Sequence, residues 1–91
     1  MSPFENVVRG LERLNRELAR TRDMIAAAPS PLEERAWMAH ACTIQEARKR
    51  HLETFQRLLR EERARGVAGH WGYVPATHIW AKAAYDRLVH A

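Results

Sequence analysis

The sequence has one cysteine and no long apolar run, and these two absences exclude several classes of protein. Cys42 alone cannot form an internal disulfide, which argues against a disulfide-stabilised secreted fold and favours a reducing compartment. No apolar stretch approaches the roughly 18 residues that a membrane-spanning helix needs. The first residues also lack the basic start and apolar centre of a secretory signal. We therefore expect a soluble, cytoplasmic protein that does not act at a membrane.

Glycine and proline are also scarce. Four of each in 91 residues, with 46% hydrophobic and 29% charged residues, exclude collagen-like and low-complexity chains and are typical of a globular protein. The length predicts one domain spanning residues 1–91. A domain of this size buries a small core, so its stability is marginal without help from close packing or a second chain.

Lysine is rare as well, although the chain is basic. Fifteen basic residues against eleven acidic ones give a net charge of +4, and only Lys49 and Lys82 are lysines. Arginine suits contacts with carboxylates, phosphates and aromatic faces. The excess of positive charge is spread along the chain, whereas nucleic-acid-binding proteins more often concentrate positive charge on one face or tail. The charge therefore allows an acidic partner without requiring one.

Two segments carry the same helix-start motif. Ser-Pro-x-Glu occurs at residues 2–5 and again at residues 30–33. The serine hydroxyl of such a capping box accepts a free backbone N–H, and proline suits the first helical position because it has no N–H to leave unpaired. We expect helices to begin at residues 3 and 31.

The first expected helix, about residues 3–28, carries a heptad pattern of seam positions. These positions are Phe4, Val7, Leu11, Leu14, Leu18, Thr21, Ile25 and Ala28. A seam of this kind predicts that the helix packs against another helix along its whole length. Gly10 lies beside the seam and suggests a close backbone approach. A row of arginines is expected on the opposite face: Arg9, Arg13, Arg16 and Arg20.

The second expected helix, about residues 31–65, ends at Gly66. Its apolar stripe comprises Trp37, Ala41, Ile44, His51, Leu52, Phe55, Leu58 and Leu59. The tight junction at residues 26–29, where Pro29 disfavours helical geometry at the preceding residue, predicts an antiparallel hairpin with Phe4 near Phe55. The second helix is longer than the first, so the first helix does not cover its last turns. Either the C-terminal segment or a second copy of the chain covers them, and the second alternative predicts a two-fold homodimer.

Arg48 interrupts the apolar stripe of the second helix. An unpaired buried guanidinium is costly, so its head group should reach water or meet a carboxylate or a partner. If the hairpin is correct, residues 11–15 of the first helix lie opposite it.

The last part of the chain combines glycines with aromatic residues. Residues 66–75 predict a loop, and a shorter helix follows over about residues 76–90, on which Trp80, Ala84, Tyr85 and Leu88 can share a face. Aromatic residues in such a segment either complete the core or form an exposed binding site, because Trp, Tyr and Arg dominate interface energetics. The fold class expected from these patterns is all-α, a long helical hairpin followed by a shorter C-terminal helix.

The sequence contains no convincing catalytic or metal-binding pattern. His40 and His51 lie about 16 Å apart along one helix, and His40 points away from Cys42. The common zinc and phosphate-loop motifs are absent. We expect no enzyme activity, no metal and no cofactor.

These observations favour a small binding protein that acts through protein–protein contacts, as an adaptor, regulator or inhibitor of a larger bacterial or phage complex. The candidate partner-binding residues are His70, Trp71, Tyr73 and Trp80, with the arginines of the first helix (Arg9, Arg13, Arg16 and Arg20) as a charged rim.

Two alternatives remain open. One is a DNA- or RNA-binding protein that uses Arg48, Lys49, Arg50 and Arg57 together with the arginines of the first helix. A helix-turn-helix is a specific form of it, with the segment from Thr77 as recognition helix, although the connection is longer than usual. The other alternative is a structural oligomerisation module.

Overall fold

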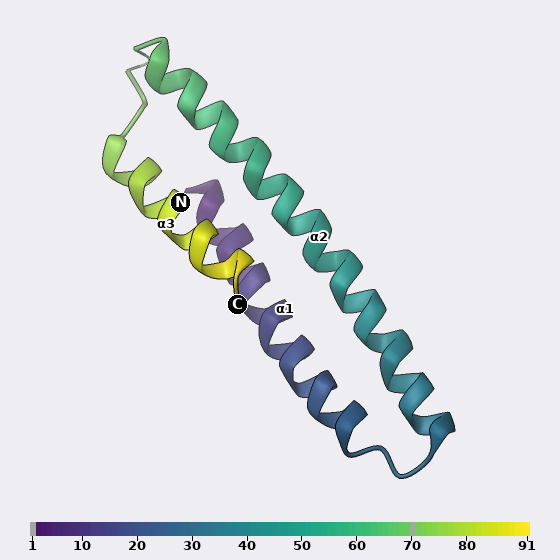
Figure 1. Ribbon diagram of the computed structural model, residues 1–91. Coiled ribbons are helices and arrows are strands. Elements are labelled where there is room, and N and C mark those ends of the chain that lie inside the picture. The colour runs from purple at the N-terminus through teal and green to yellow at the C-terminus, as the bar shows by residue number, and fades with distance from the viewer. Residues whose placement is uncertain (1, 70) are drawn as a thin grey trace.

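The computed structural model describes residues 2–69 and 71–91, which form a rod of three α-helices (Figure 1). The helices are α1 (Pro3–Ala26), α2 (Pro31–Val67) and α3 (Pro75–Val89). The rod measures 58 × 20 × 16 Å. At 1.5 Å per residue, α2 is about 55 Å long and accounts for nearly all of that length. The predicted all-α fold, a long hairpin with a shorter C-terminal helix, is confirmed.

Serine side chains cap the two long helices as the sequence predicts. The Ser2 hydroxyl accepts a hydrogen bond from the Phe4 N–H at 3.3 Å, and the Ser30 hydroxyl accepts one from the Glu33 N–H at 3.3 Å. Helix α1 ends at Ala26, slightly earlier than expected. Pro29 contributes to this early end because it disfavours helical geometry in the residue before it.

Helices α1 and α2 pack as the predicted antiparallel hairpin. The buried side chains of α1 are those of the heptad seam up to Thr21, with Val8 added beside it: Phe4, Val7, Val8, Leu11, Leu14, Leu18 and Thr21. The Phe4 and Phe55 rings lie 5.8 Å apart between centroids, which confirms the expected register of the two helices.

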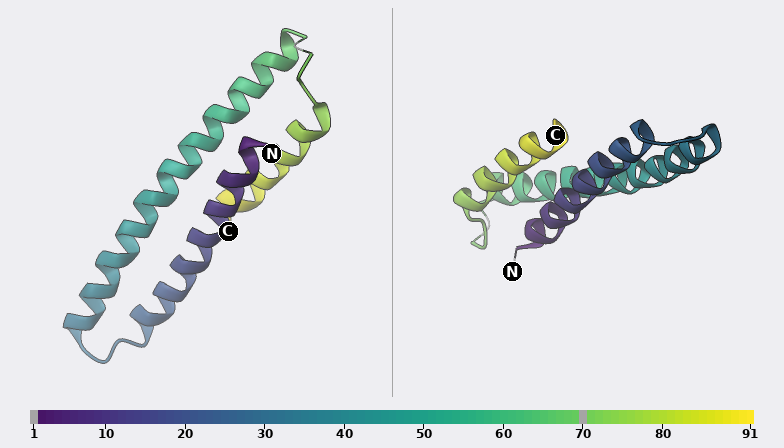
Figure 2. Two further views of the ribbon diagram at one scale, coloured as in Figure 1. Left: turned by 180° about the vertical axis from the view of Figure 1, so that it is seen from behind. Right: turned by 90° about the horizontal axis from the view of Figure 1, so that it is seen from below.

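Helix α3 covers the last turns of α2 and lies beside the N-terminal half of α1 (Figures 1 and 2). Phe4, Leu11 and Phe55 form one core cluster with Ala81, Ala84 and Leu88 of α3. Leu58 and Leu59 pack against this cluster. The turns of α2 that overrun α1 are therefore covered by the C-terminal segment, so these leucines give no reason to expect a second copy of the chain.

The other half of the rod is a two-helix hairpin. Leu14 and Leu18 of α1 pack there against Ala41 and Ile44 of α2 in a second, smaller cluster. Met24, Leu32 and Met38 remain exposed at this end. None of the helices, in residues 2–69 and 71–91, contains a stretch apolar enough to span a bilayer.

Helix α2 continues one residue past Gly66, where the sequence predicted its end. The chain turns at Gly69 instead, which has a positive φ of 69° that glycine adopts without strain. Gly66 has a different role, because a methyl group there would lie 2.8 Å from Cζ of Tyr73. Its missing side chain makes room for the Tyr73 ring.

Candidate functional site

Large apolar side chains are exposed at the end of the rod where α2 stops and α3 begins. Trp71 is 93% exposed and Ile79 is 70% exposed. With their neighbours they make up what we call the C-terminal apolar group: Val67, Trp71, Val74, Ile79 and Trp80. Exposed apolar side chains are common when scattered singly, but several within fourteen residues of sequence indicate a contact surface.

Helix α3 is apolar on two opposite faces. Its inner face, which contributes Ala81, Ala84 and Leu88, is buried against the hairpin. Its outer face carries exposed residues at the i, i+3, i+4, i+7 spacing of one helical face: Ala76, Ile79, Trp80 and Ala83. Large apolar side chains on a helix face are normally covered by another element. The outer face of α3 is therefore the most conspicuous uncovered surface among the described residues.

The structure resolves where Trp80 lies. The sequence allowed Trp80 to share a face with Ala84 and Leu88 and left open whether it belongs to the core or to an exposed binding site; its side chain is 46% exposed. Ala81 joins Ala84 and Leu88 on the buried face. The small alanines at positions 81 and 84 allow α3 to approach the hairpin closely, and the bulky indole is directed away from the buried face.

The two tyrosines of the C-terminal segment support the fold rather than the exposed surface. Tyr85 is half-buried, with its ring edge-on to Phe55 at 5.3 Å, and its hydroxyl accepts a hydrogen bond from Gln56 Nε2 at 2.7 Å. Tyr73 is half-buried over Gly66, and its ring lies 6.3 Å from that of His78. His70 lies outside the described residues.

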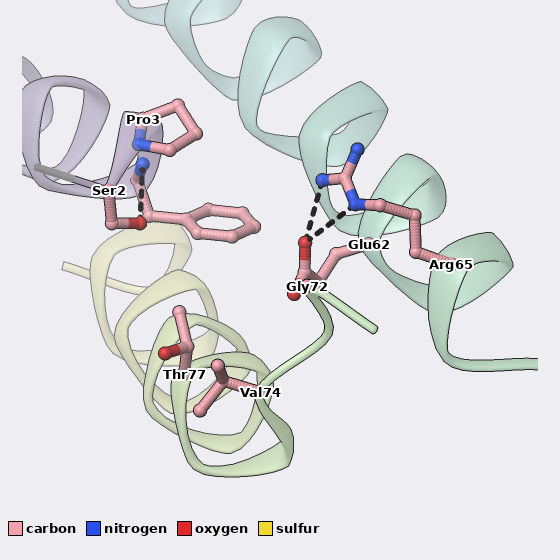
Figure 3. Close-up of a pocket in the computed structure, with 8 residues that line it drawn as sticks. Ser2, Pro3, Glu62, Arg65, Gly72, Val74 and Thr77 are labelled. Atoms are coloured by element: carbon pink, nitrogen blue, oxygen red, sulfur yellow. Dashed lines mark hydrogen bonds and ion pairs between the residues drawn. The ribbon is translucent and has the colours of Figure 1, made fainter. Parts of the chain in front are cut away.

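A hollow of about 380 Å³ lies between the start of α1, the end of α2 and the start of α3 (Figure 3). Its polar wall is an ion pair in which Nε and Nη2 of Arg65 donate to Oε2 of Glu62 at 3.3 and 2.7 Å. Glu62 is only 7% exposed. The hollow is also lined by the first residues of α1 and α3, where a carboxylate is favoured by the helix dipoles. The pair therefore lies on α2 in a hollow that the starts of α1 and α3 also line.

Sequence reasoning missed Glu62, although a signal was present. Glu62 follows Phe55 by seven residues, so it continues the buried stripe of α2. An acidic residue at a seam position indicates a buried ion pair, and Arg65 at i+3 is its partner.

Arg48 is bound within the chain. Its Nε donates to Oδ1 of Asn15 at 2.7 Å, and its Nη2 donates to the carbonyl oxygens of Leu88 and Val89 at 2.9 and 3.1 Å. The Asn15 amide also donates to the Leu88 carbonyl at 3.3 Å. The acceptors are an amide and main-chain carbonyls rather than the expected carboxylate or water. Arg48 thus ties the end of α3 to both long helices.

Arginines of α1 and the exposed Trp80 border different hollows. Arg9, Arg13 and Arg16 line a hollow of about 540 Å³ together with Gly10 and His51. Trp80 borders a different hollow, lined by Ser2, Glu5, Ala76 and Thr77. Arg20 is exposed further along α1, and Arg13 forms an exposed ion pair with Glu17 at 4.0 Å. The hollows therefore do not join these arginines to the C-terminal apolar group as a rim.

The other basic residues assigned to the nucleic-acid alternative are exposed on α2. Lys49 and Arg50 follow the bound Arg48 directly. Arg57 lies two turns further on and pairs with Glu61 at 3.8 Å. Of the four residues in that set, Arg48 donates through Nε and Nη2 to acceptors within the chain.

The remaining nucleophile and metal-ligand types stay apart. Cys42 is exposed. The His40 ring lies edge-on to the Trp37 ring, with 6.0 Å between their centroids. His51 lies on another part of α2, where its ring packs over Gly10 of α1. Across residues 2–69 and 71–91, no three histidine, cysteine, aspartate or glutamate side chains gather closely enough to hold a metal ion.

Comparisons with family models, with curated proteins and with solved structures find no match for this chain. The function is therefore argued from the residues themselves.

Proposed function

We propose that the protein is a small, non-enzymatic binding protein that acts through protein–protein contacts, as an adaptor, regulator or inhibitor of a larger complex. The observation that carries the proposal is the outer face of α3, which presents Ile79 and Trp80 to solvent on a helix whose other face is already buried. A partner that covers this face would bury the large apolar side chains that the rest of the chain leaves exposed.

The chemistry of the exposed residues supports a protein partner. Two of the chain's three tryptophans, Trp71 and Trp80, belong to the C-terminal apolar group. Tryptophan provides a large contact area with few rotatable bonds, and it is the residue type most enriched among interface residues that dominate binding energy. Burying a large apolar side chain at an interface contributes about 1.5–3 kcal/mol. Two such anchors would contribute substantially to a contact when the surrounding residues exclude water.

The nucleic-acid alternative has weaker support. Arg48 is occupied by Asn15 and α3, and Arg57 is paired with Glu61, which leaves Lys49 and Arg50 as the unpaired members of that set among the described residues. Phosphate binding normally uses several unpaired cations along one track.

The experiment that tests the proposal is affinity capture from a lysate of the source cells with the full chain as bait. The variant Trp71→Ala/Trp80→Ala should lose the partner, because it removes both aromatic anchors. The matched control is Trp37→Ala, which removes the third tryptophan from the opposite end of the rod. If the double variant retains the same proteins as the unmodified chain and the control, the proposed surface is wrong.

A further inference from the structure

A further hollow, of about 330 Å³, lies between α2 and α3. It is lined by Leu59, Arg60 and Arg63 of α2 and by His78 and Lys82 of α3. We call it the basic cleft. Leu59 is its apolar lining residue, three of its lining residues are cationic, and no acidic residue lines it.

The cations of the basic cleft are not neutralised by the rest of the described chain. Arg60, Arg63 and Lys82 are exposed and form no ion pair within 4.0 Å among residues 2–69 and 71–91. Their neighbours on α2 differ, since Arg57 pairs with Glu61 and Arg65 pairs with Glu62. Three unpaired cations around one hollow favour an anion of complementary charge.

His78 adds a fourth polar group to the cleft. Its ring contacts Tyr73, which is itself packed over Gly66, so the ring is held against the end of α2. The Nδ1 atom is buried without a hydrogen-bond partner in the part of the chain that the structure describes. His78 therefore lines the cleft with a polar ring whose Nδ1 is unsatisfied among the described residues.

Exposed apolar residues accompany the cations on both helices. Val67 follows Arg63 at i+4 on α2, and Ile79 precedes Lys82 by three residues on α3, so each pair shares a helical face. Val67 is 85% exposed. A ligand that meets this surface encounters positive charge and apolar side chains together.

We propose that the basic cleft binds the carboxylates of an acidic, amphipathic segment of the protein partner. The arginine guanidinium groups match a carboxylate through paired hydrogen bonds, Lys82 adds a point charge, and Val67 and Ile79 receive the apolar side chains of the segment. This inference rests on the proposed protein-binding function and specifies the chemistry of the partner.

Acidic residues on both helices argue against a nucleic acid in the same cleft. Glu53 lies two turns before Arg60 on α2, and Asp86 lies one turn after Lys82 on α3, and both are exposed. The run of positive charge therefore ends within a short distance along each helix. A phosphate backbone needs a longer basic track, whereas one or two carboxylates fit the cleft as it stands.

The test uses nuclear magnetic resonance titration of the full chain with a defined probe. The probe is a capped peptide that alternates glutamate and leucine, and its control replaces each glutamate by glutamine. At constant ionic strength, the acidic peptide should shift the amide signals of residues 59–63 and 78–82. Absence of these shifts, or equal shifts with the glutamine peptide, overturns the proposal. So does a single-stranded oligonucleotide that binds the same residues more tightly than the peptide.

A pair of matched variants separates the cleft from net charge. Arg60→Gln/Arg63→Gln/Lys82→Gln should weaken binding of the acidic peptide by about tenfold or more, because it removes several charge-assisted hydrogen bonds. Arg9→Gln/Arg13→Gln/Arg16→Gln removes the same charge from the outer face of α1 and should leave the affinity unchanged within about twofold. Equal weakening by both variants overturns the proposal. All six positions are exposed, so both variants are expected to fold, and circular dichroism checks this.

The captured partner distinguishes failure of the cleft from failure of the proposed function. The cleft variant should reduce capture, as Trp71→Ala/Trp80→Ala does. If the tryptophan variant loses the partner while the cleft variant retains it fully, the cleft proposal fails and the protein-binding function stands. If neither variant reduces capture, both proposals fail.

Discussion

The Arg48 guanidinium donates a hydrogen bond to the Leu88 carbonyl at 2.9 Å, and this bond joins the middle of α2 to the last turn of α3. The last carbonyls of a helix have no partner within it, and cations are favoured there by the helix dipole. Arg48 supplies both the donor and the charge. It also bonds to Asn15, so one side chain fixes where all three helices meet.

Arg48→Met should therefore destabilise the fold. The substitution keeps most of the aliphatic stem but removes hydrogen bonds to Asn15, Leu88 and Val89, at a cost of about 2 kcal/mol. Urea denaturation measures the change. The control is Arg50→Met, an exposed arginine two residues away, which should change the stability by less than about 0.5 kcal/mol. Equal effects of the two substitutions would show that the contacts of Arg48 do not contribute.

Gly10→Ala should destabilise the protein although alanine is the better helix former. A methyl group at this position would lie 2.7 Å from Cδ2 of His51, whose Nδ1 is 2.9 Å from the Ala47 carbonyl oxygen. Displacing that ring should outweigh the gain of about 1 kcal/mol expected from helix propensity.

The double variant Gly10→Ala/His51→Ala tests this explanation. With the ring removed, the glycine-to-alanine change should become stabilising, which a double-mutant cycle measures as a coupling energy. A stabilising Gly10→Ala in the unmodified background would mean that His51 moves away at little cost.

Glu62 and Glu61 form a matched pair of neighbouring glutamates in different environments. Glu62 is buried and bonded to Arg65 at 2.7 Å, whereas Glu61 is exposed and pairs with Arg57 at 3.8 Å. Glu62→Gln should cost about 1–2 kcal/mol, because it weakens a charge-assisted hydrogen bond next to two helix starts. Glu61→Gln should cost about 0.5 kcal/mol or less, as exposed pairs do. Thermal unfolding compares them, and a larger effect at Glu61 would contradict the structural role of Glu62.

Some aromatic residues stabilise the fold, whereas others can be replaced by alanine with little effect on stability. Phe55→Ala should cost about 3–5 kcal/mol, since Phe55 is fully buried against Phe4 and Tyr85. Trp71→Ala and Trp80→Ala should each change the stability by less than about 1 kcal/mol, because both indoles are exposed. Chemical denaturation of the three variants checks this division. A cooperative loss of structure in the tryptophan variants would place these residues in the core.

The helical hairpin was predictable from the sequence because short sequence signals determine it. The serine caps and the heptad seam of α1 determine where the long helices begin and which face of α1 is buried, and the register of Phe4 with Phe55 follows from the short connection. The face of α3 was not predictable in the same way. Ala81 gives no stronger signal than Trp80, and only the approach of α3 to the hairpin decides between them.

The candidate sites were predictable only in part for the same reason. Trp71 and Trp80 could be selected by residue type, but the sequence left open whether they were core or exposed. The basic cleft and the contacts of Arg48 depend on where α3 docks on α2, because their residues are distant in sequence. Glu62 differs from these residues, because its position on the buried stripe of α2 could have been identified from the sequence.

The central claim is that the exposed tryptophans bind a protein, and a salt-resistant capture measures this most directly. After nuclease treatment and a wash at about 0.5 M salt, which screens surface charge contacts and weakens phosphate binding, the full chain should still retain its partner. Trp71→Ala/Trp80→Ala should retain at most about a tenth as much, and Lys49→Gln/Arg50→Gln/Arg57→Gln should retain the normal amount. Loss of the partner from the full chain on nuclease treatment, or equal retention by the tryptophan variant, would contradict the account.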